Sequence, residues 1–151
     1  MRLFVLLATF AMFCGIAFLF KVDDYISLSG RLAMCAMLLF SAITSYVYQE
    51  GIFLTYPDYI NNVWKQKLIL VNADLKIALA AGFILKDTAQ ITTFFLIVYF
   101  VATLPTEIKT CNDKVSVKRA NHTGHGNWLF LIKIPALIFF VLWAYYFGLV
   151  L

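Results

Sequence analysis

Five long apolar stretches recur along this chain, and each approaches the length of about 20 residues that a helix needs to cross a bilayer. They cover residues 3–20, 31–48, 68–85, 89–104 and 129–151, and the main polar loop covers residues 106–127. With 63% hydrophobic and only 13% charged residues, the folded chain cannot present a water-soluble surface. We therefore predict an all-α integral membrane helical bundle in the lipid bilayer. It forms one domain over residues 1–151, with a four-helix core and an extra N-terminal helix.

The first apolar stretch, residues 3–20, has two interpretations. A membrane helix and a secretory signal peptide both open in this way, with a basic residue such as Arg2 before an apolar run. The stretch ends in Phe18-Leu19-Phe20-Lys21, which is bulky where a signal peptidase prefers small residues. We therefore expect a retained membrane helix. Its cleavage would leave the other four spans in the same orientation.

The net charge of +4 comes from Lys and Arg residues that fall mainly between the apolar stretches. Membrane proteins concentrate basic residues in this way on the inner side, so the charge does not indicate nucleic acid as a partner. With the N-terminus inside, the inner segments contain Arg2, Lys65, Lys67, Lys109, Lys114, Lys118 and Arg119, and the outer ones Lys21, Arg31 and Lys86. The positive-inside rule therefore predicts an inner N-terminus and an outer C-terminus.

The third stretch is interrupted by polar side chains at Asn72, Asp74 and Lys76. At 1.5 Å per residue, Lys76 lies roughly 12 Å from the start of that span, near the middle of a hydrocarbon core about 30 Å thick. A charge at that depth costs at least about 2.5 kcal/mol, so it should face the bundle interior and have a partner. One hypothesis is a pocket for a quinone-like or lipid head group, or a proton relay. The other is an ion pair that locks helices together.

The helical period separates these polar side chains. Asp74 and Lys76 point about 200° apart, whereas Asn72 and Lys76, four residues apart, share a face. Each charge therefore needs a partner on another helix. The candidates are Arg31 and Lys133 for Asp74, and Glu50, Glu107 and tyrosine hydroxyls for Lys76.

The segment 51–66 is rich in polar and aromatic residues and includes Tyr56 and Pro57. This composition predicts a loop or a short interfacial helix across the mouth of the bundle.

His122 and His125 have an HxxH spacing in the polar loop, which could supply two metal ligands. A pair of imidazoles in a glycine-containing loop is a weak metal site, and a solvated loop is the alternative interpretation. No histidine lies inside a predicted span, so haem ligation by histidine within the bilayer is excluded. The sequence thus makes no cofactor evident, although a quinone fits the buried-charge hypothesis.

From Arg31 onward the order of features resembles the DoxX-like family of small multi-span bacterial membrane proteins. The stretch Gly30-Arg31-Leu32-Ala33-Met34 is similar to the opening of that family's first helix, and Lys86-Asp87-Thr88-Ala89 is similar to the turn of its helical hairpin. The last connection and the last helix of that family are similar in residue type to two closing segments of this chain, Leu131-Ile132-Lys133-Ile134-Pro135 and Leu142-Trp143-Ala144-Tyr145. The N-terminal stretch is additional to that four-helix core.

The resemblance implies an accessory subunit of a quinone-linked redox system in a bacterial cytoplasmic membrane, associated with an oxidoreductase and without activity of its own. On that interpretation Asp74, Lys76 and Arg31 line a pocket for the quinone head group. Two alternatives remain open. One is a bundle that binds, or isomerises, a lipid or another small apolar ligand, and the other is a purely structural subunit of a membrane complex.

Overall fold

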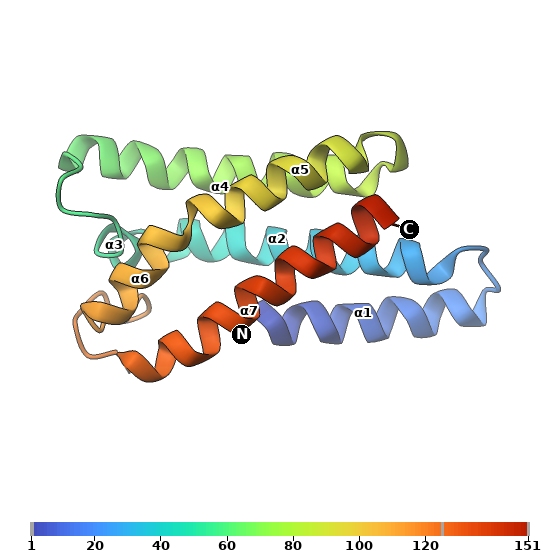
Figure 1. The fold of residues 1–151 in the computed structure, drawn as a ribbon, viewed down its shortest axis with the longest axis horizontal. Coiled ribbons are helices and arrows are strands. Elements are labelled where there is room, and N and C mark those ends of the chain that lie inside the picture. The colour runs from blue at the N-terminus through green and yellow to red at the C-terminus, as the bar shows by residue number, and fades with distance from the viewer. Residues whose placement is uncertain (1, 125, 151) are drawn as a thin grey trace.

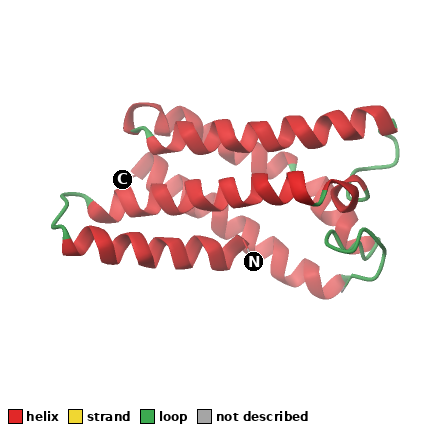
Figure 2. Ribbon diagram, turned by 180° about the vertical axis from the view of Figure 1, so that it is seen from behind, coloured by secondary structure: helices red, strands yellow, loops and turns green. Residues whose placement is uncertain are grey.

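The computed structural model describes residues 2–124 and 126–150, except for the side chains of Asn127, Leu129 and Phe130. The described part of the chain is an all-α bundle (Figures 1 and 2), in which the only β feature is an isolated bridge between Ser116 and Asn121. This confirms the predicted fold class.

Helices account for most of the described chain. Their order is α1 (Arg2–Leu19), α2 (Tyr25–Val47), α3 (Gln49–Phe53), α4 (Asn62–Ile84), α5 (Lys86–Ala102), α6 (Leu104–Asn112), α7 (Asn127–Tyr145) and the π-helical turn η1 (Tyr146–Val150).

The short helix α6 occupies the first part of the predicted polar loop, so the loop begins at Asp113 and not at residue 106. Pro105 lies in the first turn of α6, where its fixed φ suits a helix start and its missing N–H costs nothing. Glu107, also in that turn, interacts favourably with the positive end of the helix dipole. Local helix signals therefore override the polar composition of this segment.

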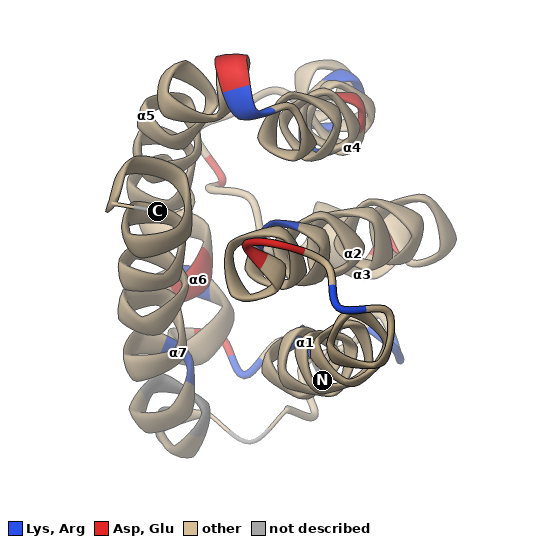
Figure 3. Cartoon of the chain, turned by 90° about the vertical axis from the view of Figure 1, so that its right-hand side faces the viewer, with Lys and Arg blue, Asp and Glu red and all other residues tan. Residues whose placement is uncertain are grey.

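The helices form two layers, seen end-on in Figure 3. One layer contains α4, α2 and α1, with α2 in the middle, and the other contains α5, α6 and α7. Small residues allow this central position: Ala33 and Ala42 on α2 and Ala80 on α4 are at most 1% exposed. Larger side chains, among them Phe83 and Leu96, fill the space between the layers. The core therefore lies around α2.

A tight connection joins α4 to α5, with only Leu85 between them. The helices approach closely because Gly82 has no side chain: a Cβ there would lie 2.5 Å from the Thr92 hydroxyl oxygen. The Thr88 hydroxyl donates a hydrogen bond to the Gly82 carbonyl at 2.8 Å and closes the turn.

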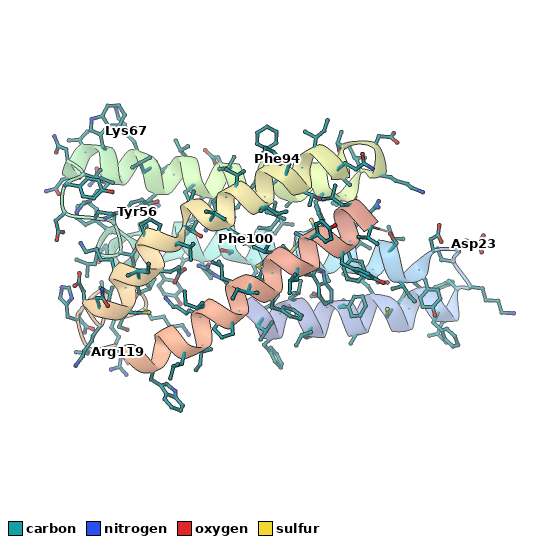
Figure 4. The ribbon with its side chains drawn as sticks, in the orientation of Figure 1. Asp23, Tyr56, Lys67, Phe94, Phe100 and Arg119 are labelled. Atoms are coloured by element: carbon teal, nitrogen blue, oxygen red, sulfur yellow. The ribbon has the colours of Figure 1, made fainter. Side chains whose placement is uncertain are left out.

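The surface of the bundle is apolar. Phe94, for example, projects outward from α5 and is 65% exposed (Figure 4), and the helical ribbon in Figure 3 is almost entirely uncharged. Within the described residues, four stretches are long and apolar enough to cross a membrane: α1, α2, α5 continuing into α6, and the segment Leu131–Val150. Helix α4 has the length but carries four charged side chains. Helix α4 packs beside α2 but is displaced along it, because Lys76 near the middle of α4 meets Ser41 and Ser45 toward the C-terminal end of α2.

Candidate functional site: a polar cavity inside the bundle

A cavity of about 110 Å³ lies inside the bundle, toward the end at which α3 and α6 are found. Its walls come from each of the helices α1 to α7, from the segment after α3 and from Val117 in the polar loop, and polar side chains predominate. The polar lining residues are Arg2, Thr44, Ser45, Thr55, Tyr56, Asn72, Lys76, Tyr99, Thr103, Thr106, Glu107, Thr110 and Lys133.

Lys76 lies on the α4 wall of this cavity and is only 5% exposed. Its ammonium nitrogen donates to the Ser45 hydroxyl at 2.7 Å and to the Ser41 carbonyl at 3.4 Å, and both belong to α2. The Ser45 hydroxyl in turn donates to the Ser41 carbonyl at 2.9 Å. The hydrogen-bond partners of Lys76 are therefore uncharged, although a buried cation is stabilised most by a carboxylate or another anion.

Asn72 lies one turn before Lys76 on the same face of α4 and connects two tyrosines. The Tyr99 hydroxyl donates to the Asn72 side-chain oxygen at 2.8 Å, and the Asn72 amide nitrogen donates to the Tyr56 hydroxyl at 3.2 Å. This chain joins α5, α4 and the segment after α3. Because the Tyr56 oxygen is the acceptor, its own proton can be donated to a ligand in the cavity.

Glu107 is the one carboxylate among the residues that line the cavity. Its Oε2 lies 2.6 Å from the Lys133 ammonium of α7, and its Oε1 lies 3.7 Å from the Arg2 guanidinium of α1. One carboxylate thus faces two cations from two other helices. These two ion pairs join α6 to α1 and to α7.

A second, wider cavity of about 470 Å³ lies on the loop side of the first. The polar loop and the start of α7 line it, and Arg119 marks this end of the molecule in Figure 4. Thr110, Val117 and Lys133 line both cavities. The ion pair between Lys133 and Glu107 therefore lies at the boundary between an inner and an outer space.

A rim of charged residues holds Tyr56 in place. Lys109 donates to the Tyr56 carbonyl at 2.8 Å and to the Asp58 carboxylate at 2.7 Å, and Lys65 lies 3.7 Å from the same carboxylate. The hydrogen bond and charge of Lys109 lower the pKa of Asp58 below its usual value, and Lys65 adds to that effect. Figure 4 shows Tyr56 at this end of the bundle, below α4.

The structure separates the residues that the sequence suggested as partners. Asp74 lies on the exposed side of α4, where the Tyr46 hydroxyl donates to it, so the predicted pairing with Arg31 or Lys133 is wrong. The physical reason is the helical period, which directs Asp74 away from the cavity that Lys76 lines. Arg31 is 6% exposed but donates to the Phe147 carbonyl at 3.1 Å, and it does not line the cavity.

The remaining sequence candidates also lie apart. Glu50 is exposed in the first turn of α3, so it is not the partner of Lys76. His122 is exposed, and its Nδ1 lies 3.0 Å from the Asp113 carbonyl oxygen. His125, the other histidine of the predicted pair, lies outside the described residues, as does Leu151 at the end of the last predicted span.

Sequence reasoning missed most of the cavity wall formed by α5 and α6. Thr103, Glu107 and Thr110 follow Tyr99 at helical spacing, and Thr106 lies beside Glu107. Such a polar stripe of residues at i, i+4, i+8 and i+11 lies along one face of a helix. The stripe is readable from the sequence, but the polar composition of residues 106–112 predicts a loop where the structure has α6.

Comparisons with family models, with curated proteins and with solved structures find no match for this chain. The fold and its apolar surface define the class: a multi-pass α-helical membrane protein with a polar cavity inside the bundle.

Proposed function

We propose that the protein binds the polar head group of an amphipathic membrane molecule in the inner cavity. The observation that carries this proposal is Lys76, which is 5% exposed, lies against a cavity and has only uncharged hydrogen-bond partners. Burying a cation inside a helical bundle is costly, and a purely structural lysine would be expected to face a carboxylate. A bound head group would supply the missing interaction.

The surroundings of the cavity support a ligand with one polar and one apolar end. Polar side chains line the cavity, whereas apolar side chains such as Phe94 and Ile91 cover the outer surface of α5. A molecule from the bilayer would place its head among the hydroxyl groups and leave its chain in the apolar surroundings. This is the lipid-binding or small-ligand-binding alternative that the sequence left open.

A DoxX-like accessory subunit of a quinone-linked redox system is the second candidate, and the hydrogen-bond chain of Tyr99, Asn72 and Tyr56 favours it. Phenol and amide donors of this kind can bind a quinone carbonyl oxygen. The cavity of about 110 Å³ is smaller than the roughly 150 Å³ of a cavity that admits benzene, so a quinone ring would require it to widen. For that reason we rank this candidate second.

The proposed setting is a bacterial cytoplasmic membrane with the N-terminus inside. The bundle end that contains α3, α6 and the polar loop carries Lys65, Lys67, Lys109, Lys114 and Arg119, and the opposite end carries Lys21 and Lys86. The positive-inside rule assigns the richer end to the cytoplasm.

The test is to purify the tagged chain from its own membrane in mild detergent and to identify bound molecules and proteins by mass spectrometry. Lys76→Met removes the buried cation, and Lys67→Met is the matched control, because Lys67 is exposed on the same helix. We expect one amphipathic molecule in fixed stoichiometry with the unaltered chain and the Lys67 variant, and its loss from the Lys76 variant. Equal bulk lipid in all three would contradict the proposal. A stoichiometric quinone or oxidoreductase would favour the second candidate.

A further inference from the structure

The charges around the inner cavity do not balance. Arg2, Lys76 and Lys133 face it together with a single carboxylate, that of Glu107. The Arg2 side chain is 49% exposed and is therefore partly hydrated, and Lys133 is paired with Glu107 at 2.6 Å, so the excess positive charge rests mainly on Lys76. An uncompensated positive charge inside a membrane bundle is unfavourable, and an anion in the cavity would neutralise it.

The hydrogen-bond donors around the cavity match the same kind of ligand. The Lys76 ammonium has three protons and uses two of them on Ser45 and Ser41, and the Tyr56 hydroxyl proton is available because that oxygen accepts from Asn72. Carboxylate and phosphate oxygens accept charge-assisted hydrogen bonds from such groups, and these bonds are about twice as strong as neutral ones.

The size of the cavity limits what can enter. At about 30 Å³ for each water molecule, a volume of about 110 Å³ corresponds to three or four waters. A carboxylate or a phosphate group fits that space, whereas the whole of a lipid head group such as a sugar does not. The cavity volume, its excess positive charge and its hydrogen-bond donors therefore all favour a small oxyanion as the ligand.

The outer cavity gives this oxyanion a path from the aqueous side. It is about four times larger than the inner one, contains Arg119 and Lys133, and shares its inner wall with the first cavity. Basic groups at a cavity mouth raise the local concentration of anions and speed their association.

We propose that the inner cavity binds a phosphate or carboxylate group between Lys76 and Lys133, and that the outer cavity connects this site to the aqueous side. The proposal rests on the function proposed above and specifies its ligand: the head group is an oxyanion. A phosphorylated or carboxylated amphiphile and a free anion share this chemistry.

Binding of four probes to the full chain in nanodiscs of neutral lipid tests the proposal: decyl phosphate, decanoate, decanol and inorganic phosphate. We expect decyl phosphate or decanoate to bind at one molecule per chain and at least about tenfold more tightly than decanol, as expected for one charge-assisted hydrogen bond. This comparison uses the unaltered chain and does not depend on any variant folding. Lys76→Met should abolish the preference, and Lys67→Met should retain it.

The possible outcomes separate the two proposals. Equal binding of decanol and both anionic amphiphiles would overturn the oxyanion inference and leave the head-group function intact. No specific binding of any amphiphile would overturn both. Binding of inorganic phosphate as tight as that of decyl phosphate would support the oxyanion site and contradict the amphipathic ligand.

The path is tested by Arg119→Gln, because Arg119 lines only the outer cavity. Loss of a charge at the mouth should slow association of decyl phosphate and weaken its dependence on salt, while the dissociation rate stays the same. An unchanged association rate at low salt would show that the anion reaches Lys76 by another route.

Discussion

The hydrogen bond between Tyr99 and Asn72 joins α5 to α4, and its strength can be measured with a double-mutant cycle. The changes are Asn72→Leu, Tyr99→Phe and the two combined. At 2.8 Å the bond has ordinary geometry. Interhelical hydrogen bonds in membrane proteins average about 0.6 kcal/mol and reach about 1.7 kcal/mol, because the unfolded chain in a membrane also finds partners. We expect a coupling free energy of about 0.5–1.5 kcal/mol.

The assay is reversible unfolding by SDS in mixed micelles, followed by tryptophan fluorescence. Trp143 is a suitable reporter because its ring lies 4.7 Å from that of Phe147 in the core. The matched control combines Asn72→Leu with Tyr145→Phe, since Tyr145 is 51% exposed on α7. Distant changes add, so the control cycle should give no coupling. A Tyr99 coupling no larger than this control would refute the cavity geometry.

Two further predictions concern the close approach of Gly51 to Val117 and the contact of Asp58 with Lys109. Gly51→Ala should destabilise the protein by about 1–3 kcal/mol in the same assay, because a Cβ would lie 1.8 Å from the Val117 carbonyl oxygen. Gly15→Ala is the control: no atom lies within 4 Å of the new carbon, so this change should be neutral or slightly stabilising. Equal changes in stability for the two variants would contradict the close approach of Gly51 to Val117. The lowered pKa of Asp58 stabilises the fold above the carboxyl's usual pKa of about 3.9, and this contribution is lost as pH falls through the lowered value. Asp58→Asn should therefore lose less stability than the unaltered chain as pH falls below 4, and parallel curves would show that the contact to Lys109 contributes nothing.

The sequence was sufficient to predict the class of fold and the burial of Lys76, which is 5% exposed. Apolar stretches with the length of a span predict membrane helices, and a charge within such a stretch is expected to face the bundle interior. The helical period also predicts that Asn72 and Lys76 share one face of their helix, and both side chains line the cavity.

The partners of the charges could not be obtained in this way. Lys133 pairs with Glu107 and not with Asp74, because the choice depends on how α6 and α7 are rotated about their axes. The position of Tyr56 in the cavity wall likewise depends on the path of the segment after α3. The Lys109 ammonium fixes that path by donating to the Tyr56 carbonyl. Such details depend on contacts between residues far apart in the sequence.

The last turns of the chain have a consequence for the order of assembly. The carbonyl of Phe147 accepts from Arg31, 116 residues earlier, and the ring of Trp143 packs against Phe10 of the first helix at 5.0 Å. Helices α1 and α2 therefore obtain these contacts only once α7 and η1 have joined the bundle. Removing Trp143 and the residues after it would leave α1 with its packing against α2 but without these contacts to α7 and η1.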